Sequence, residues 1–170
     1  MAPALDDLGS PLLARLIRGV PGAVLGVHAQ VGDLTASVDA SRLLEVMRFL
    51  RDDPAAAFDM LMDLTAVDYQ GYPGRSGARF EMVYHLYSLE QSQRLRVKAA
   101  VAEGACEIDS LVELWPAANW MEREVWDLYG IRFRGHPDLR RILLYEEFEG
   151  HPLRKDYPKE RRQPLIGPRN

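Results

Sequence analysis

Apolar residues recur at intervals of three and four in two stretches near the start of the chain, and this period predicts two amphipathic helices. The first would begin at Ser10-Pro11, because Ser is a favoured N-cap and Pro suits the first helical position. The second would be capped by Ser41 and would end at Asp52-Asp53-Pro54. The apolar stripes of these helices are Leu12, Leu13, Leu16 and Ile17, and then Leu43, Leu44, Met47 and Leu50.

Alternating apolar and polar residues predict five strands. Residues 24–31 and 34–38 flank Gly32-Asp33, a pair that suits a tight two-residue hairpin. Three further strands are predicted within residues 59–69, 79–89 and 94–101. Their alternating apolar residues are Met60, Met62, Leu64 and Ala66, then Phe80, Met82, Tyr84 and Leu86, and finally Leu95, Val97, Ala99 and Val101. Basic residues alternate with the last set, so one face of the sheet should be buried and the other should face water.

The order helix, two strands, helix and three strands predicts an α+β fold, a two-layer sandwich with helices on one face of a mostly antiparallel sheet. Ser110 to Glu113 resembles a capping box and predicts a short helix. Asn119 would then cap a C-terminal helix that ends at Gly130. Neither period continues after this glycine, and five prolines interrupt the chain. We therefore expect an α+β domain in residues 1–130 and an extended segment in residues 131–170.

Charge is divided unevenly along the 170 residues. The formal net charge is −4, but residues 151–170 carry six Lys or Arg against two acidic residues, so the tail is basic and the body acidic. An acidic body disfavours nucleic acid as a partner. The tail could be solvated, could lie on anionic lipid, or could dock in an acidic groove of a partner. We favour the partner groove.

Several classes of site are disfavoured by the residues available. The single cysteine, Cys106, allows no internal disulfide, indicates a reducing compartment and cannot by itself hold an iron–sulfur cluster. The four histidines lack metal-ligand spacing, and the glycines at 71, 74 and 77 do not form a dinucleotide fingerprint. No apolar run reaches the roughly 18 to 20 residues of a membrane helix, and the N-terminus lacks a secretory signal. We predict no catalytic, cofactor-binding or metal residue, and a membrane link only through a partner.

The segment from Glu122 to Gly130 combines several charges with large apolar side chains on about two helical turns. Glu122 and Glu124 are two apart and point to different sides of a helix, which argues against a paired acid–base site. Arg123 and Asp127 are four apart, which predicts an ion pair within the helix. A solvated charged face is the simplest interpretation. Trp, Tyr and Arg are typical of interface anchors, however, and favour a contact surface.

This part of the chain resembles a known family. Glu122-Arg123-Glu124, Asp127-Leu128-Tyr129, His136, Arg140 and Ile142-Leu143, at these spacings, are similar to the signature of the 30 kDa subunit, also named the C subunit, of respiratory complex I, the proton-translocating NADH:quinone oxidoreductase. Residues 144–158 are similar to that family's C-terminal segment. The likeness is densest from Trp120 to Pro158, and the sequence departs from the family pattern in residues 159–163.

The resemblance implies a non-catalytic subunit of the peripheral arm, packed against the large quinone-site subunit and near iron–sulfur subunits. FMN and iron–sulfur clusters would be held by the partners. The complex would lie on the cytoplasmic side of the cell (inner) membrane. The predicted partner-interface residues are Glu122, Arg123, Glu124, Trp126, Asp127, Tyr129, His136, Arg140, His151, Arg154, Lys155, Asp156 and Tyr157.

Two alternatives remain at this point. Related subunits occur in membrane-bound hydrogenase-type complexes, so the chain could serve an equivalent place there. From another class, a free-standing small enzyme would use Asp, Glu and His side chains in a cleft between the sheet and the tail.

Overall fold

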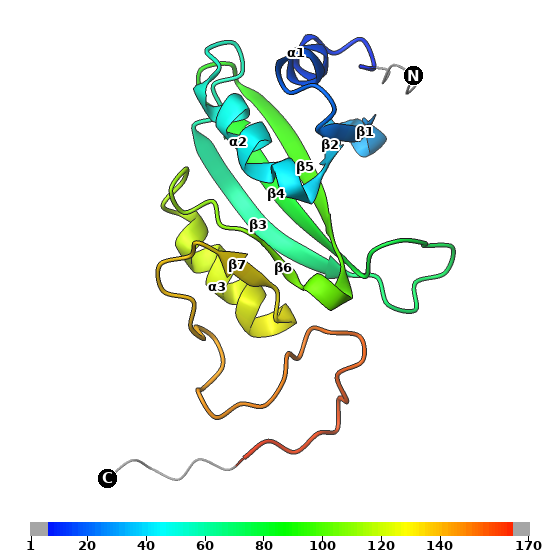
Figure 1. Ribbon diagram of the computed structural model, residues 1–170, viewed down its shortest axis with the longest axis vertical. Coiled ribbons are helices and arrows are strands. Elements are labelled where there is room, and N and C mark those ends of the chain that lie inside the picture. The colour runs from blue at the N-terminus through cyan, green and yellow to red at the C-terminus, as the bar shows by residue number, and fades with distance from the viewer. Residues whose placement is uncertain (1–6, 165–170) are drawn as a thin grey trace.

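A twisted sheet with helices on one of its faces forms the body of the protein in the computed structural model, which describes residues 7–164 (Figure 1). The α-helices of this region are α1 (Pro11–Gly19), α2 (Leu43–Asp52) and α3 (Ala118–Tyr129). The strands are β1 (Val24–His28), β2 (Thr35–Val38), β3 (Met60–Asp68), β4 (Phe80–Ser88), β5 (Gln93–Val101), β6 (Glu107–Asp109) and β7 (Arg132–Arg134). Short 3-10 helices are η1 (Gln30–Gly32), η2 (Ala40–Arg42) and η3 (Glu103–Ala105).

The strands of the main sheet lie in the order β1-β2-β5-β4-β3 within the described residues. All neighbouring pairs are antiparallel except β2 and β5, which are parallel. A second, two-stranded parallel sheet joins β6 to β7. The predicted α+β sandwich with a mostly antiparallel sheet is therefore confirmed.

The core lies between the sheet and its helices, and the alternation of β4 and β5 decides which side chains enter it. Phe80, Met82, Tyr84 and Leu86 are buried from β4, as predicted, and so are Leu95, Val97, Ala99 and Val101 from β5. Leu12, Leu13 and Leu16 fill the core from α1, next to the N-cap Ser10, whose side chain accepts from Leu13 N–H. The buried residues of α2 are Leu43, Val46, Met47 and Leu50. Val46 thus replaces the predicted Leu44, which is only partly buried.

Two strand predictions need correction. The β1–β2 hairpin exists, but its connection is longer than two residues because the chain makes a 3-10 turn at η1, where Val31 has φ 59°. In β3, the register shifts between Leu61 and Asp63. A bulge of this kind breaks the alternation. Leu61 therefore lies in the core, whereas Met60 and Met62 are 45% and 41% exposed.

Three predicted helix caps are wrong. Asp39, not Ser41, provides the cap before η2, where its carboxylate accepts from Ser41 N–H at 2.9 Å. Ser110 is followed by turns and not by a helix, and its hydroxyl accepts from Val112 N–H at 3.2 Å while it donates to Glu122 Oε2. Asn119 lies inside α3, which begins at Ala118 without a side-chain cap.

The end of α3 agrees with the prediction, whereas the core continues past it. Gly130 adopts φ 73°, and its N–H donates to Trp126 O at 2.8 Å. Beyond this glycine, the buried Ile131 and Phe133 belong to the core, and β7 pairs with β6. The short parallel pairing of β7 was not predicted. The docking of residues 131–170 on a partner stays a prediction.

Gly130→Ala is expected to destabilise the protein more than Gly74→Ala. The two glycines have nearly the same φ, 73° and 74°. An alanine in this region costs about 1–2 kcal/mol from backbone strain alone. At Gly74 an added Cβ meets nothing within 4 Å, but at Gly130 it would lie 2.5 Å from the His151 ring. The ring must then move and weaken a hydrogen bond to α3, which adds about 1 kcal/mol. Denaturant unfolding of both variants measures the difference, and equal losses would contradict this packing.

Candidate functional site

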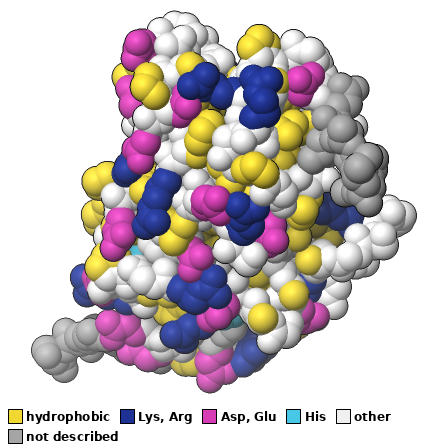
Figure 2. Space-filling view, turned by 45° about the horizontal axis from the view of Figure 1, so that its top comes forward, with side chains coloured by type: hydrophobic (Ala, Val, Ile, Leu, Met, Phe, Trp, Pro, Cys, Tyr) yellow, Lys and Arg dark blue, Asp and Glu magenta, His cyan; other side chains and the backbone are white. Residues whose placement is uncertain are grey.

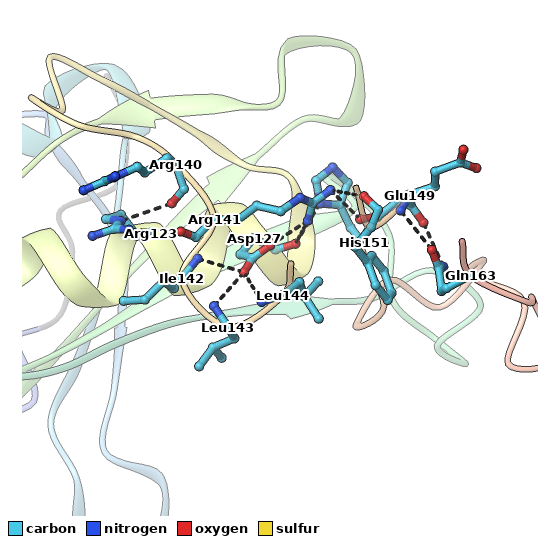
Figure 3. Close-up of polar contacts among 12 residues, drawn as sticks. Arg123, Asp127, Arg140, Arg141, Ile142, Leu143, Leu144, Glu149, His151 and Gln163 are labelled. Carbon is cyan, nitrogen blue, oxygen red and sulfur yellow. Dashed lines mark hydrogen bonds and ion pairs between the residues drawn. The ribbon is translucent and has the colours of Figure 1, made fainter. Parts of the chain in front are cut away.

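The side chain of Asp127, on α3, binds residues 141–144, in the part of the chain that follows the sheets and helices (Figure 3). Its buried carboxylate accepts hydrogen bonds from three successive backbone N–H groups, those of Ile142, Leu143 and Leu144, at 2.9–3.1 Å from Oδ2. Arg141 Nη1 donates to Oδ1 at 2.6 Å. Burial alone would raise the pKa of Asp127, but these donors outweigh it and lower the pKa below its ordinary value. The carboxylate is thus a charged acceptor around which residues 141–144 are wrapped.

Arg141 joins this carboxylate to a later turn of the same segment. Its Nη2 donates to the carbonyl oxygens of Phe148, at 2.8 Å, and Gly150, at 3.3 Å. The guanidinium also lies near the rings of Trp126 and Phe148, with centroid distances of 5.9 and 5.8 Å. A planar group with five donors suits such multiple contacts better than a lysine would.

Arg123 does not form the predicted ion pair with Asp127. It donates from Nε to Arg140 O at 3.1 Å and from Nη2 to Arg141 O at 2.9 Å, and it lies 5.5 Å from the Trp120 ring. The prediction was wrong because Asp127 takes four donors from the segment while Arg123 takes two carbonyls from it. The side chains of Arg123 and Asp127 therefore both point at the same stretch of backbone (Figure 3).

The segment of residues 135–164, called here the C-terminal segment, also caps the end of α3. The last carbonyls of a helix lack partners within the helix. Three of them accept hydrogen bonds from the segment: Asp127 O from His151 Nδ1 (2.9 Å), Leu128 O from Leu153 N (3.1 Å) and Tyr129 O from Arg154 Nε (2.5 Å). A cationic side chain near this end is also favoured by the helix dipole.

A second buried carboxylate, Asp68 at the end of β3, holds the segment further along. It accepts from Lys155 N–H at 2.8 Å and from Gln70 N–H at 2.9 Å. Arg79 donates to both of its oxygens, and the same guanidinium pairs with Asp156 at 2.7 Å. Burial opposes the charge of Asp68, but these partners lower its pKa overall. Two acids of the body therefore hold one extended strip of chain.

The last part of the C-terminal segment folds back on itself through contacts between its own residues. The rings of Phe148 and Tyr157 are stacked, with centroids 6.1 Å apart. Gln163 Nε2 donates to Glu149 O at 3.1 Å, and its Oε1 accepts from Glu149 N–H at 2.9 Å. These bonds fold residues 148–163 into a loop beside α3.

Glu122 lies on a different side of α3 and contacts the body. It is buried, and its carboxylate accepts from the Ser110 hydroxyl and from Leu111 N–H, both at 2.6 Å. Burial raises its pKa to about 7, although these two hydrogen bonds oppose the shift. Glu122 and Glu124 point to different sides of α3, as predicted, because Glu124 is exposed.

The thirteen predicted interface residues are now placed in the structure. Three are buried against this chain itself, namely Glu122, Arg123 and Asp127. Four are exposed, namely Glu124, Arg140, Lys155 and Asp156. The others are half-buried, namely Trp126, Tyr129, His136, His151, Arg154 and Tyr157. His136 accepts from Asp138 N–H at Nδ1, so its Nε2 donates to Asn119 O. Their contact with a partner stays a prediction.

Three residues with a central role were missed, namely Asp68, Arg79 and Arg141. Asp68 ends an alternating strand as a polar residue at an inward position, a signal that the sequence carries. Arg79 and Arg141 have no comparable signal, since their partners lie 11 to 77 positions away along the chain. In residues 7–164, no group of three or more His, Cys, Asp or Glu could hold a metal ion. No helix in this range is long and apolar enough to cross a membrane.

Asp127→Asn is expected to loosen the C-terminal segment. Removal of the charge from this buried carboxylate leaves the half-buried Arg141 without its counter-ion and should cost about 3–5 kcal/mol. Asp138→Asn is the matched control, because the Asp138–Arg140 pair is exposed and should contribute at most about 1 kcal/mol. Denaturant unfolding gives the free energies, and amide hydrogen exchange at residues 142–144 reports the local opening. Unchanged exchange in the Asp127 variant would contradict the role of the carboxylate.

Glu122→Gln is expected to flatten the pH dependence of stability. Between pH 4.5 and about 7, the folded protein binds more protons at Glu122 than the unfolded chain does. The free energy of unfolding therefore falls as pH rises through this window, by at most about 3 kcal/mol. His85 and His151, whose pKa values burial lowers, titrate in both proteins. The difference between the two unfolding curves thus isolates Glu122, and parallel curves would argue against a raised pKa.

Comparison with known sequences gives a consistent result. The family model described as "Respiratory-chain NADH dehydrogenase, 30 Kd subunit" matches residues 36–163. The C subunit of the NADH-quinone oxidoreductase of Rhodopseudomonas palustris (strain TIE-1) is 50% identical over 155 residues, which are 91% of this chain and 74% of that protein. The C subunit of the Rhodobacter capsulatus NADH-quinone oxidoreductase is 49% identical over 158 residues, which are 93% of this chain and 75% of that protein.

Solved structures agree in fold. The trypsin-resistant fragment (1–134) of Nqo5 superposes with a TM-score of 0.60 and 35% identity, over 66% of this chain and 88% of that one. A chain of the membrane-bound sulfane sulfur reductase, an archaeal respiratory membrane complex, gives a TM-score of 0.71 over 88% of this chain and 85% of that one, at 22% identity, which is a likeness of fold. From the match over residues 36–163 and these identities, the chain belongs to the 30 kDa subunit family of the respiratory-chain NADH dehydrogenase.

Proposed function

We propose that this chain is a peripheral-arm subunit of a proton-translocating NADH:quinone oxidoreductase, where it packs against the large quinone-site subunit. The observation that carries this proposal is the match to the C subunit of NADH-quinone oxidoreductases, at about half identity over nine tenths of the chain. In this role the chain supports electron transfer from NADH to quinone without an active site of its own. FMN and the iron–sulfur clusters belong to partner subunits, and the assembly lies on the cytoplasmic side of the cell membrane.

The surface proposed for the partner is the outer side of the C-terminal segment. Its backbone is turned toward Asp127 and Asp68, so several large apolar side chains point away from the body. The exposed ones in this area are Trp120, at the start of α3, and Leu143, Tyr145 and Leu153. Exposed apolar groups gathered on one strip, with a basic tail beside them, are typical of a surface that a partner covers.

The buried charges of α3 support this surface indirectly. Arg123 and Asp127 bond to the C-terminal segment, so we assign them the task of shaping the surface that the partner contacts, whereas Glu122 joins α3 to the body. Direct polar contacts would come from the exposed members of the predicted set, such as Glu124 and Arg140. Specificity would then depend on the shape of the segment as much as on charge.

Nucleic acid is not proposed as a partner. The net charge is negative, and the face in Figure 2 carries basic and acidic side chains side by side instead of one basic area. Nucleic-acid binding depends on a clustered positive surface.

Leu143→Glu together with Leu153→Glu is expected to reduce the recovery of partner subunits with the tagged chain from detergent-solubilised membranes. A charge at a dry contact must lose its water, and the loss of affinity should be about tenfold or more. Leu25→Glu is the control, because Leu25 on β1 is 63% exposed and Leu143 is 62% exposed. All variants should unfold at the same temperature as the parent chain, since these side chains contribute little to the core.

The outcome separates the proposals clearly. Recovery of the parent chain as a lone soluble protein would overturn the assembly role and favour a free-standing enzyme. Recovery of the same partners with the Leu143 and Leu153 variant would leave the assembly role intact but move the contact elsewhere.

A further inference from the structure

The face of the main sheet opposite the helices has a hollow of its own. Its volume is about 280 Å³, and the residues that line it come from the chain just before β2 and from β3, β4 and β5. The lining residues used below are Asp33, Met62, Asp63, His85, Arg94 and Arg96. This place lies across the sheet from the helices that pack on the core, and it takes no part in holding the C-terminal segment.

Register places the side chains of the hollow in two rows across the strands. In one row, Asp63 pairs with His85, and His85 pairs with Arg96. Arg94 lies two residues further along β5, opposite Tyr87, whose ring it faces at 5.9 Å. These residues alternate with the core residues of the same strands, so they point away from the helices.

Only part of the charge in the hollow is neutralised. Arg96 pairs with Asp33 at 2.7 Å. Burial, followed by nearby Arg96, lowers the pKa of His85, so its ring is neutral near pH 7. Arg94 and Asp63 form no ion pair within residues 7–164. Among these described residues, the hollow therefore offers one free cation and one free carboxylate on opposite sides of a neutral ring.

The distance between these two charges can be estimated from the geometry of the sheet. They lie two strands and about two residues apart, which corresponds to about 12 Å at ~4.8 Å per strand and ~3.3 Å per residue. An extended peptide covers this distance in about three to four residues. Apolar surface lies at the same place, since Met60 and Met62 are exposed beside the hollow. Methionine adapts well to the shape of an incoming side chain.

We propose that this hollow is a second docking surface, which takes an extended segment of a neighbouring subunit. The segment would place one apolar side chain in the hollow, a basic residue against Asp63 and an acidic residue, three to four positions away, against Arg94. A protein segment fits better than a compact ligand, because the two free charges lie about 12 Å apart on an open sheet face. The proposal rests on the assembly role but concerns the face away from the C-terminal segment.

Site-specific photo-crosslinking in the isolated complex tests this proposal. Para-benzoylphenylalanine would replace Met62 in one variant and Leu143 in another, and the tagged complex would be irradiated after purification from membranes. The expected result is a covalent adduct from position 62 to a peptide of another subunit. Its sequence should contain an apolar residue between a basic and an acidic residue, separated by three to four positions.

Charge reversal provides the second readout. Arg94→Glu should lower the yield of the position-62 adduct about tenfold, because it opposes the acidic residue of the segment with a like charge. Arg48→Glu is the control, since Arg48 is exposed on α2 on the helical side. Thermal unfolding of both variants should match that of the parent chain, so a change in yield would report on docking.

Four results would overturn the docking proposal. These are an adduct from position 143 without one from position 62, an adduct with a lipid or small molecule, a captured peptide that lacks the charge pattern, and a yield unaffected by Arg94→Glu. The first of these leaves the assembly role standing. Failure of the assembly role itself looks different, because the tagged chain would then be recovered alone and neither position would give an adduct.

Discussion

The structure depends on the way that one carboxylate, Asp127, gathers donors from a distant part of the chain. A buried carboxylate is costly unless its lone pairs are filled. Three successive backbone N–H groups and Arg141 fill them here, so the chain must bend around α3 at residues 141–144. Once that bend exists, the following residues lie beside the end of the helix and supply donors to its last carbonyls. The cost of burying the acid thus enforces the course of a long stretch without helix or strand.

The elements of the sheet were predictable because their side chains follow a simple period. In β4 and β5, alternation alone identifies the inward residues, such as Tyr84 and Val97. The same rule failed at Met60 and Met62, since a bulge in β3 moves the register by one residue and nothing in the local pattern marks it. Helix caps failed for a related reason. Ser110 has the right spacing for a capping box, but its hydroxyl bonds to Glu122, twelve residues further along.

Several residues of the site were predicted from the sequence, but the groups that they contact were not. Glu122, Arg123 and Asp127 were chosen because charges on an aromatic helix suggest a partner, yet their bonds are made within the chain. Sequence spacing favours the four-residue pair of Arg123 with Asp127, which stabilises by only about 0.2–0.5 kcal/mol. Several charge-assisted hydrogen bonds to one buried acid outweigh that term. Asp68 is marked as a polar residue at an inward strand position, but no local rule names Arg141 or shows what either residue contacts, because those contacts close loops of fourteen and eighty-seven residues.

The body holds the C-terminal segment largely by its backbone. Asp127 and Asp68 accept from main-chain N–H groups of the segment, and Arg123 donates to two of its main-chain carbonyls. The backbone of the segment therefore attaches it to the body, while its side chains remain available to a partner. Side chains such as Leu143 and Leu153 can be exchanged during evolution without weakening the contact with the body. The body bonds to backbone atoms, and every amino acid has these, except that proline lacks the N–H. Because the backbone of the segment stays fixed, the protein can adjust its fit to a partner one side chain at a time.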